Sequence, residues 1–123
     1  MSLLQAKREE LAALVATATG YRGRAFVPEA INESSAIVVP GSTYVSSGDR
    51  FGTVNVSFGV LLVEIPRDNE TAANRIDDAI EDTLVALINA DWSVGDTLAP
   101  QTYDFGGVTV YATEINATTA VAL

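Results

Sequence analysis

Four carboxylates, Asp77, Asp78, Glu81 and Asp82, form the only dense group of side chains in this sequence whose types and spacing could do chemistry. Carboxylates at positions i and i+4 of a helix can hold a hard cation such as Mg²⁺. Aspartate-rich helices that bind metal also need a large helical cavity and a second acidic motif, and this sequence has neither. We therefore expect a solvated helix face, or a face that contacts a partner or lines a channel, and no metal site.

The composition excludes most other catalytic groups. The chain has no His and no Cys, so it has no disulfide, no thiol nucleophile, no His general base and no zinc site built from His or Cys. The short segment Gly20-Tyr21-Arg22-Gly23 lacks the lysine of a phosphate-binding loop. Lys7 is the sole lysine, and no nucleophile motif accompanies it. We expect no catalytic residues and no cofactor, and hence a protein that is not an enzyme.

The charge is strongly negative and unevenly placed. The formal net charge is −9, and all of it comes from residues 51–123, because residues 1–50 hold equal numbers of acidic and basic side chains. Wrapping of nucleic acid needs clustered Lys and Arg, so this role is excluded. The imbalance predicts a solvated acidic face, a joint between oppositely charged surfaces of two copies, or an acidic surface that does not hold DNA.

The length and periodicity predict a single α+β domain over residues 1–123. With 123 residues, 48% of them hydrophobic, the chain can bury one core. Helical periodicity predicts a first helix over residues 3–19, begun by a Ser2–Gln5 capping box and ended at Gly20. A second helix is predicted over residues 70–90, with Asp68 or Asn69 as its N-cap. Its apolar stripe comprises Ile76, Ile80, Leu84, Leu87 and Ile88, and Trp92 covers its end.

Alternating residues predict the strands of an antiparallel-rich sheet that carries both helices on one face. Short strands are expected at Ala25–Val27 and Ala36–Val39, the second closed by Pro40-Gly41. Residues 53–65 read as the longest strand. Its Leu61–Ile65 end is apolar on both faces, which predicts cover by a helix or a neighbouring subunit. A hairpin around Gly106-Gly107 joins residues 102–105 to 108–115.

Two segments remain outside these predicted elements. Residues 41–52 are expected to form a contact arm, either a loop or a reaching hairpin, and its contact residues are Tyr44, Val45, Arg50 and Phe51. The alternative is that Tyr44 and Phe51 fold back onto the core. Residues 117–123 are expected to be a short apolar tail. No segment is long and apolar enough to span a membrane, and Met1–Gly20 does not resemble a signal peptide.

The order and spacing of several short pieces resemble the tail terminator (tail completion) proteins of long-tailed bacteriophages. The pieces are Phe26-Val27-Pro28-Glu29, Ala36-Ile37-Val38-Val39-Pro40-Gly41, Tyr44-Val45, Phe51-Gly52, Ile76-Asp77-Asp78-Ala79-Ile80, and Val108-Thr109-Val110-Tyr111 leading into Glu114-Ile115. The resemblance covers most of the chain as a pattern, without a diagnostic motif.

The resemblance implies a structural virion protein of the tail–neck region, present in the host cytoplasm during assembly. Such proteins form a homohexameric ring that caps the tail tube, ends its polymerisation and provides the head–tail joining surface. The partners would be other copies of the chain, the tail tube protein and a head-completion (neck) protein, with DNA passing through the ring without specific binding. The arm would contact a subunit or the tube, and the carboxylates at positions 77, 78, 81 and 82 would face the lumen or an interface.

Three other functions stay open from the sequence. A tail tube subunit would have more strand and a longer loop between rings. A head-completion protein would share the size and the general design. A small soluble ligand-binding α+β domain would need a closed apolar pocket with convergent polar groups, which the sequence does not offer.

Overall fold

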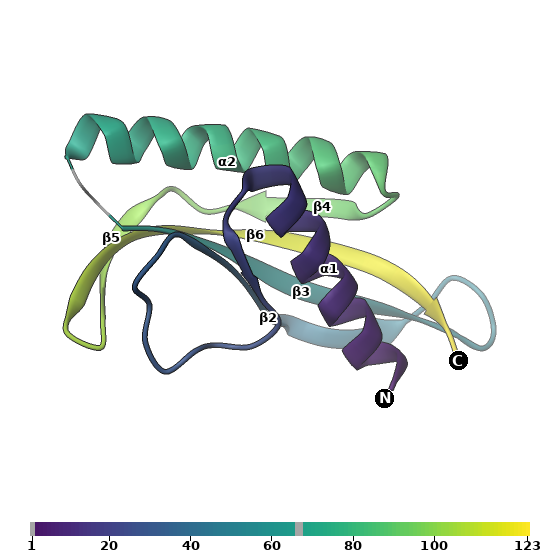
Figure 1. The fold of residues 1–123 in the computed structure, drawn as a ribbon. Coiled ribbons are helices and arrows are strands. Elements are labelled where there is room, and N and C mark those ends of the chain that lie inside the picture. The colour runs from purple at the N-terminus through teal and green to yellow at the C-terminus, as the bar shows by residue number, and fades with distance from the viewer. Residues whose placement is uncertain (1, 66–67) are drawn as a thin grey trace.

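The protein is a single small domain with two helices and a mixed, mostly antiparallel sheet, as its computed structural model shows for residues 2–65 and 68–123. Both helices lie over the same face of the sheet (Figure 1). The sheet order is β1-β2-β3-β6-β4, with β5 beside the other half of β6, and β1 and β2 are the one parallel pair among these neighbours. The predicted α+β class is confirmed. The elements are α1 (Leu3–Thr19), β1 (Arg22–Arg24), β2 (Ser35–Ser47), β3 (Thr53–Glu64), α2 (Asn69–Asn89), β4 (Ser93–Thr97), β5 (Gln101–Phe105) and β6 (Val108–Ala122).

The helix ends follow the capping signals in the sequence. Ser2 and Gln5 form the reciprocal capping box at the start of α1, and Gly20 ends it with a φ of 76°. At the start of α2, the Asp68 carboxylate accepts a hydrogen bond from the Thr71 backbone N–H at 2.8 Å. The predicted first helix is confirmed at both ends, and the predicted second helix is confirmed to within one residue at each end. Neither helix in the described part of the chain is long and apolar enough to cross a membrane.

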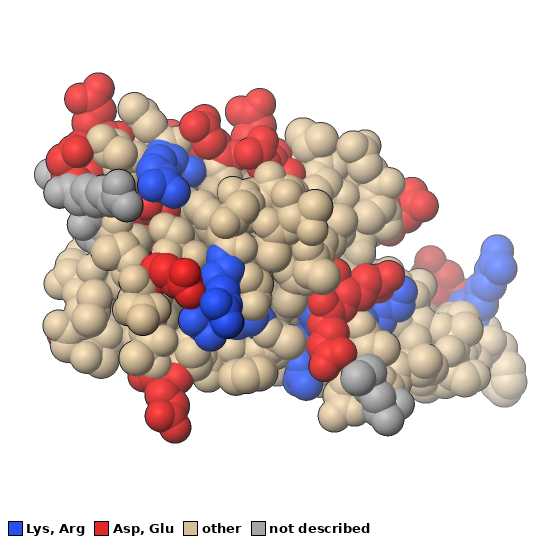
Figure 2. Space-filling model, viewed as in Figure 1, with Lys and Arg blue, Asp and Glu red and all other residues tan. Residues whose placement is uncertain are grey.

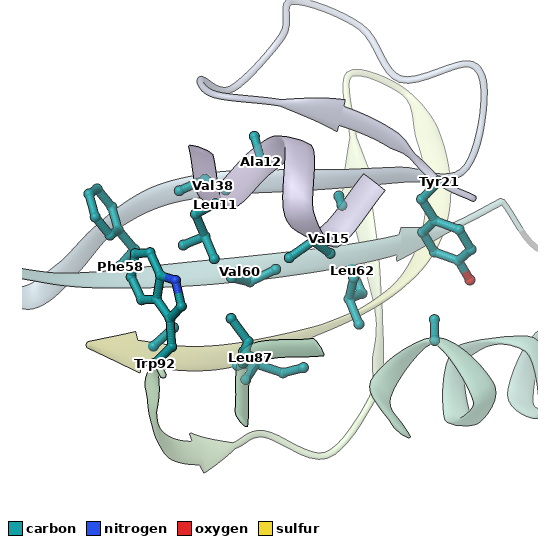
Figure 3. Close-up of a cluster of buried hydrophobic side chains, with 14 of the residues drawn as sticks. Leu11, Ala12, Val15, Tyr21, Val38, Phe58, Val60, Leu62, Leu87 and Trp92 are labelled. Atoms are coloured by element: carbon teal, nitrogen blue, oxygen red, sulfur yellow. The ribbon is translucent and has the colours of Figure 1, made fainter. Parts of the chain in front are cut away.

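The main core lies between the helices and the sheet. Val56, Phe58, Val60 and Leu62 of β3 point to the helix side and are fully buried, as the alternation predicts. They pack with residues of both helices, including Leu11, Val15, Ile76 and Leu87 (Figure 3). Trp92 is buried after α2, and its ring centroid lies 6.2 Å from that of Phe58. This burial stabilises the domain chiefly by removing apolar surface from water.

One residue of the predicted helical stripe is misplaced. Ile88 is 63% exposed, whereas Thr83 is fully buried. The buried stripe runs through positions 76, 79, 83 and 87, in steps of three and four residues. Ile88 lies one position, about 100°, further round the helix and so points away from the sheet.

A smaller core lies on the opposite face of the sheet, at the Leu61–Glu64 end of β3. It contains Ile31, Ile37, Val63, Val110 and Ala112. The prediction that this end is covered on both faces is confirmed, and helices cover one of these faces, as predicted. On the other face, the segment before β2, which contributes Ile31, and the β5–β6 hairpin lie beside β3, and the alternative cover by a neighbouring subunit stays a prediction.

Two strand predictions were too short. β2 does not end at Pro40-Gly41 but continues to Ser47, and its register against β3 shifts between Pro40 and Val45, where four residues of β2 lie opposite one of β3. The predicted arm at 41–52 therefore shrinks to the turn at 48–52, and its reaching-hairpin form is the one observed. The predicted tail at 117–123 is the end of β6, where Ala117 and Val121 are buried against the helices.

Three further details of the sheet differ from the sequence predictions. β6, and not β3, is the longest strand. The short strand expected at Ala25–Val27 lies at Arg22–Arg24, because there it pairs in register with Ser35–Ile37. β4 was not predicted, since only Val94 among its five residues is even partly buried.

Candidate interaction surfaces

The tip of the β2–β3 hairpin carries the most exposed large apolar side chain in the described chain. Phe51 is 108% exposed, and its neighbour Arg50 is exposed as well. Arg50, like Arg8, has no ion-pair partner among the described residues, whereas Lys7, Arg22, Arg24 and Arg75 each have one. Isolated exposed apolar side chains are common on protein surfaces. An exposed apolar side chain that lies beside an unpaired cation at a projecting turn is consistent with a site of contact with another molecule.

Hydrogen bonds fix the backbone of this tip. The Arg50 carbonyl accepts from the Thr53 N–H at 3.1 Å and from the Thr53 hydroxyl at 2.7 Å. The Gly48 N–H donates to the Thr53 carbonyl, and the Leu123 N–H donates to the Gly52 carbonyl at 2.9 Å. Gly52 has a φ of 81°, a conformation that favours glycine. The tip is thus pre-organised, which lowers the entropy lost on binding.

The other two predicted arm residues lie on β2, away from the tip. Tyr44 is half-buried and packs edge-on against Phe58, with ring centroids 5.6 Å apart. The alternative that Tyr44 folds back onto the core is therefore confirmed, while the same alternative was wrong for Phe51. Val45 is 43% exposed. The structure thus separates Tyr44, which anchors the hairpin, from Arg50 and Phe51, which it presents to solvent.

The outer edge of β2 has no strand partner beyond Ile37 within the described chain. β1 pairs only with Ser35–Ile37, so the segment from Val38 to Ser47 presents an unpaired edge. Such edges can accept a strand from another chain, unless side chains or bulges disrupt them. The bulge between Pro40 and Val45 interrupts this edge and limits regular pairing to shorter stretches.

The four predicted carboxylates share one exposed face of α2. Asp77, Asp78, Glu81 and Asp82 are all exposed, on the side of the helix away from the sheet. Acidic side chains gather along this edge of the molecule in Figure 2. Only Arg75 among the described residues of α2 is basic. The face is therefore a source of negative potential at the surface.

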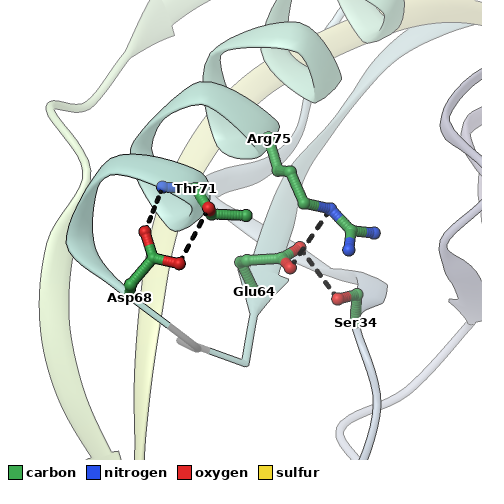
Figure 4. Close-up of polar contacts among 5 residues, drawn as sticks. All are labelled: Ser34, Glu64, Asp68, Thr71 and Arg75. Carbon is green, nitrogen blue, oxygen red and sulfur yellow. Dashed lines mark hydrogen bonds and ion pairs between the residues drawn. The ribbon is translucent and has the colours of Figure 1, made fainter.

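Beside this face, a buried polar cluster joins β3, α2 and the segment before β2 (Figure 4). The Glu64 carboxylate, 3% exposed, accepts a hydrogen bond from the Ser34 hydroxyl at 2.8 Å and lies 3.4 Å from Arg75 Nε. Burial raises the pKa of the nearby Tyr21 hydroxyl, and the Glu64 carboxylate raises it further. The cluster was not identified from the sequence, because Glu64 is a single acidic residue at the end of a predicted strand and nothing nearby in the sequence indicates its partners.

The described residues show no cation site at this cluster or elsewhere. In residues 2–65 and 68–123, no group of three or more acidic side chains is placed to hold a metal ion. Glu64 is already matched by Arg75, so the cluster is best described as an ion pair that holds α2 to the end of β3.

An apolar hollow of about 330 Å³ opens on the face of the sheet away from the helices. Its floor is the smaller core, and exposed Val27, Leu98 and Tyr103 form much of its rim. Its charged lining residues are the carboxylates Asp104 and Glu114. The sequence analysis missed this hollow, since its walls come from segments far apart in the chain. The apolar Leu61–Ile65 face was the one signal for it.

The described residues thus present four candidate surfaces: the hairpin tip, the outer edge of β2, the acidic face of α2 and the apolar hollow. Of the four predicted arm residues, Arg50 and Phe51 lie at the hairpin tip. No protein-family model matches the sequence, and a search of curated proteins finds no match either.

Proposed function

We propose that this chain is a structural protein that assembles into a ring and caps a bacteriophage tail tube, ending its polymerisation and joining it to the head. The observation that carries the proposal is the hydrogen-bonded hairpin tip, with Phe51 fully exposed beside the unpaired Arg50. An apolar side chain in solvent gains free energy when another surface covers it, and a fixed backbone lowers the entropy lost on binding. The resemblance of the sequence pattern to tail terminators supplies the identity of the assembly.

The acidic face of α2 supports a role beside DNA that does not include binding it. A lumen lined by Asp77, Asp78, Glu81 and Asp82 would repel phosphate and let DNA slide past without being held. The same carboxylates could instead meet basic residues of a neighbour. Either arrangement removes them from bulk solvent outside the ring.

A tail tube subunit is the nearest alternative, and one observation favours it. β2 and β6 are longer than the sequence predicted, so the chain is richer in strand than expected. The long loop that a tube subunit would place between rings is reduced here to residues 48–52. Two helices also cover one face of the sheet. These features favour a terminator, or a neck protein of similar design, over a tube subunit.

A small ligand-binding domain is a second alternative from a different class. The apolar hollow, with Asp104 and Glu114 in its lining, gives this reading a site that the sequence did not suggest. Ligand pockets usually bury most of the ligand within a concave cleft. The rim residues Val27 and Leu98 are about half exposed, so the hollow is open to solvent at its rim. This shape suits a protein side chain better than a small molecule.

Tail length in phage particles tests the proposal. Assembly without this chain should give tubes of uncontrolled length that do not join heads, and supplying the chain should restore normal tails. Electron microscopy of the lysate measures both features. Normal, head-joined tails in the absence of the chain would refute the capping role.

Charge reversal tests the acidic face separately. Replacing Asp77, Asp78, Glu81 and Asp82 by Lys should slow DNA ejection if they line the lumen, or block assembly if they meet a basic neighbour. A variant with Asn and Gln at these positions controls for loss of charge alone. Normal assembly together with an unchanged ejection rate in the Lys variant would place the face outside the ring.

A further inference from the structure

We propose that the Phe51 tip of one copy inserts into the apolar hollow of the next copy, with Arg50 facing the carboxylates Asp104 and Glu114. The role of this contact in a tail rests on the proposed function. The contact adds to that function the two surfaces that join neighbouring subunits. It is head-to-tail, because the tip and the hollow are different surfaces of the chain.

The tip cannot occupy the hollow of its own chain. Phe51 lies in the turn before β3, whereas Leu61 and Val63 in the hollow lie near the other end of that strand. The eight residue steps of extended chain from Thr53 to Leu61 span about 26 Å. The hairpin and the β5–β6 turn stand at opposite ends of the sheet (Figure 1). The occupant must therefore come from a second molecule.

The hollow fits an aromatic side chain. Its volume is about 330 Å³, and its floor includes Ile37, Leu61 and Val110. Tyr103 and Phe105 on its β5 side offer rings for edge-to-face contact with a phenyl group. Contacts made by a buried aromatic anchor in a pocket carry much of the binding energy of many protein interfaces.

Arg50 can complement the acidic lining of the hollow. It lies between Asp49 and Phe51 at the tip, and it has no ion-pair partner among the described residues. The charged residues that line the hollow, Asp104 and Glu114, are both acidic. An inserted Phe51 would bring the Arg50 guanidinium close to Asp104 and Glu114, where charge complementarity favours the correct orientation. This pairing also joins the neutral half of one copy to the acidic half of the next.

Head-to-tail contacts of this kind close into a ring or continue as an open filament. The chain presents one tip and one hollow, so each copy has two neighbours. A ring uses every tip and every hollow, which leaves no apolar tip in solvent. This outcome agrees with the ring of the proposed function.

Cysteine cross-linking tests the contact directly, because the natural chain contains no Cys. Protein carrying Asp49→Cys, an exposed position of the same turn that leaves Arg50 and Phe51 in place, is mixed with protein carrying Leu98→Cys and oxidised at high concentration. We expect a disulfide-linked pair of unlike chains. A mixture with Val85→Cys is the control, since Val85 lies on α2 and is exposed to a similar degree, 53% against 51%. A chain that stays monomeric, or one that links equally well to both partners, overturns the proposal.

A charge swap tests the orientation. Arg50→Asp and Asp104→Arg should each weaken self-association at least tenfold in sedimentation experiments, and combining the two substitutions in one chain should restore it. Loss without restoration overturns the pairing of these two residues.

The results also separate this contact from the role in a tail. A disulfide between the Asp49→Cys and Leu98→Cys variants of a protein that is absent from tail particles would keep the contact and refute the terminator. A terminator without the cross-link would refute the contact alone.

Discussion

The two ends of β3 belong to one strand but have opposite surroundings. At the Leu61–Glu64 end, both faces of the strand are covered, by the helices on one side and by the smaller core on the other. At the Thr53–Ser57 end, the helix side is buried while the other side carries Asn55 and Ser57 and is only partly covered. The change from Asn and Ser to Leu and Val on one face therefore decides which end of the strand is buried on both faces and which end leads to an exposed turn.

The largest loss of stability is expected at the covered end. Leu62→Ala removes a fully buried side chain from the main core, and it should lower the free energy of unfolding by about 3 kcal/mol. Urea denaturation measures this loss. The control is Thr53→Ala at the open end, whose effect should be much smaller. Equal losses at the two ends would contradict the contrast between them.

The buried ion pair at the same end should give the next largest effect. Arg75→Ala leaves the Glu64 carboxylate, 3% exposed, without its cation. Because Arg75 itself is 44% exposed, solvent screening reduces the loss to about 2 kcal/mol.

Arg75→Lys, which keeps the charge, should recover part of this stability in the same denaturation experiment. The exposed pair of Arg22 with Glu33 is the comparison, and Arg22→Ala should cost at most about 1 kcal/mol. Equal losses for Arg75→Ala and Arg22→Ala would show that burial of Glu64 does not matter.

A smaller, pH-dependent effect is expected at the start of α2. Hydrogen bonds from the Thr71 N–H and hydroxyl hold the pKa of the Asp68 carboxyl below its ordinary value of 3.8. Because the pKa is lowered in the folded state, the ionised Asp68 carboxylate stabilises the fold. This stabilisation is fully present above pH 3.8 and is lost as the pH falls through the lowered pKa.

Asp68→Ala should therefore lower the melting temperature at pH 7 and have less effect at pH 2. Asp68→Asn, which keeps an N-cap acceptor, should lose little at either pH. Melting curves recorded by circular dichroism measure these differences. An Ala effect that is the same at both pH values would argue against the capping carboxylate.

The smallest effect on stability is expected at the hairpin tip. Phe51→Ala removes a side chain that is already in solvent, so the free energy of unfolding should change by less than about 0.5 kcal/mol. Self-association of the same variant, measured by sedimentation, should fall at least tenfold. Phe51→Tyr, which keeps the ring, is the control. A marked loss of stability would mean that the tip belongs to the core.

Local signals in the sequence were sufficient for the helices and for the side of β3 that faces them. Ser2, Gln5, Gly20 and Asp68 act within a few residues of the chain, so their effects can be read directly. The Gly106-Gly107 hairpin was predictable for the same reason, and both glycines have positive φ.

Pairing between distant segments accounts for what the sequence did not reveal. Pro40 suggested an end to β2, but pairing with β3 resumes beyond a bulge, at Val45 opposite Val56. Residues 117–123 looked like a tail because their partners on β3 lie far earlier in the chain. The hollow was missed because Val27, Leu61 and Tyr103 meet only in the folded sheet. The exposure of the Phe51 side chain could be established only once the structure of the turn at residues 48–52 was known.

The copy number of this chain in purified phage particles tests the central claim most directly. Quantitative mass spectrometry against the major tail protein measures it. The account predicts about six copies per particle, one closed ring. Copies in large excess of that number would make the chain a tube subunit, and its absence from the particles would contradict any role in the tail.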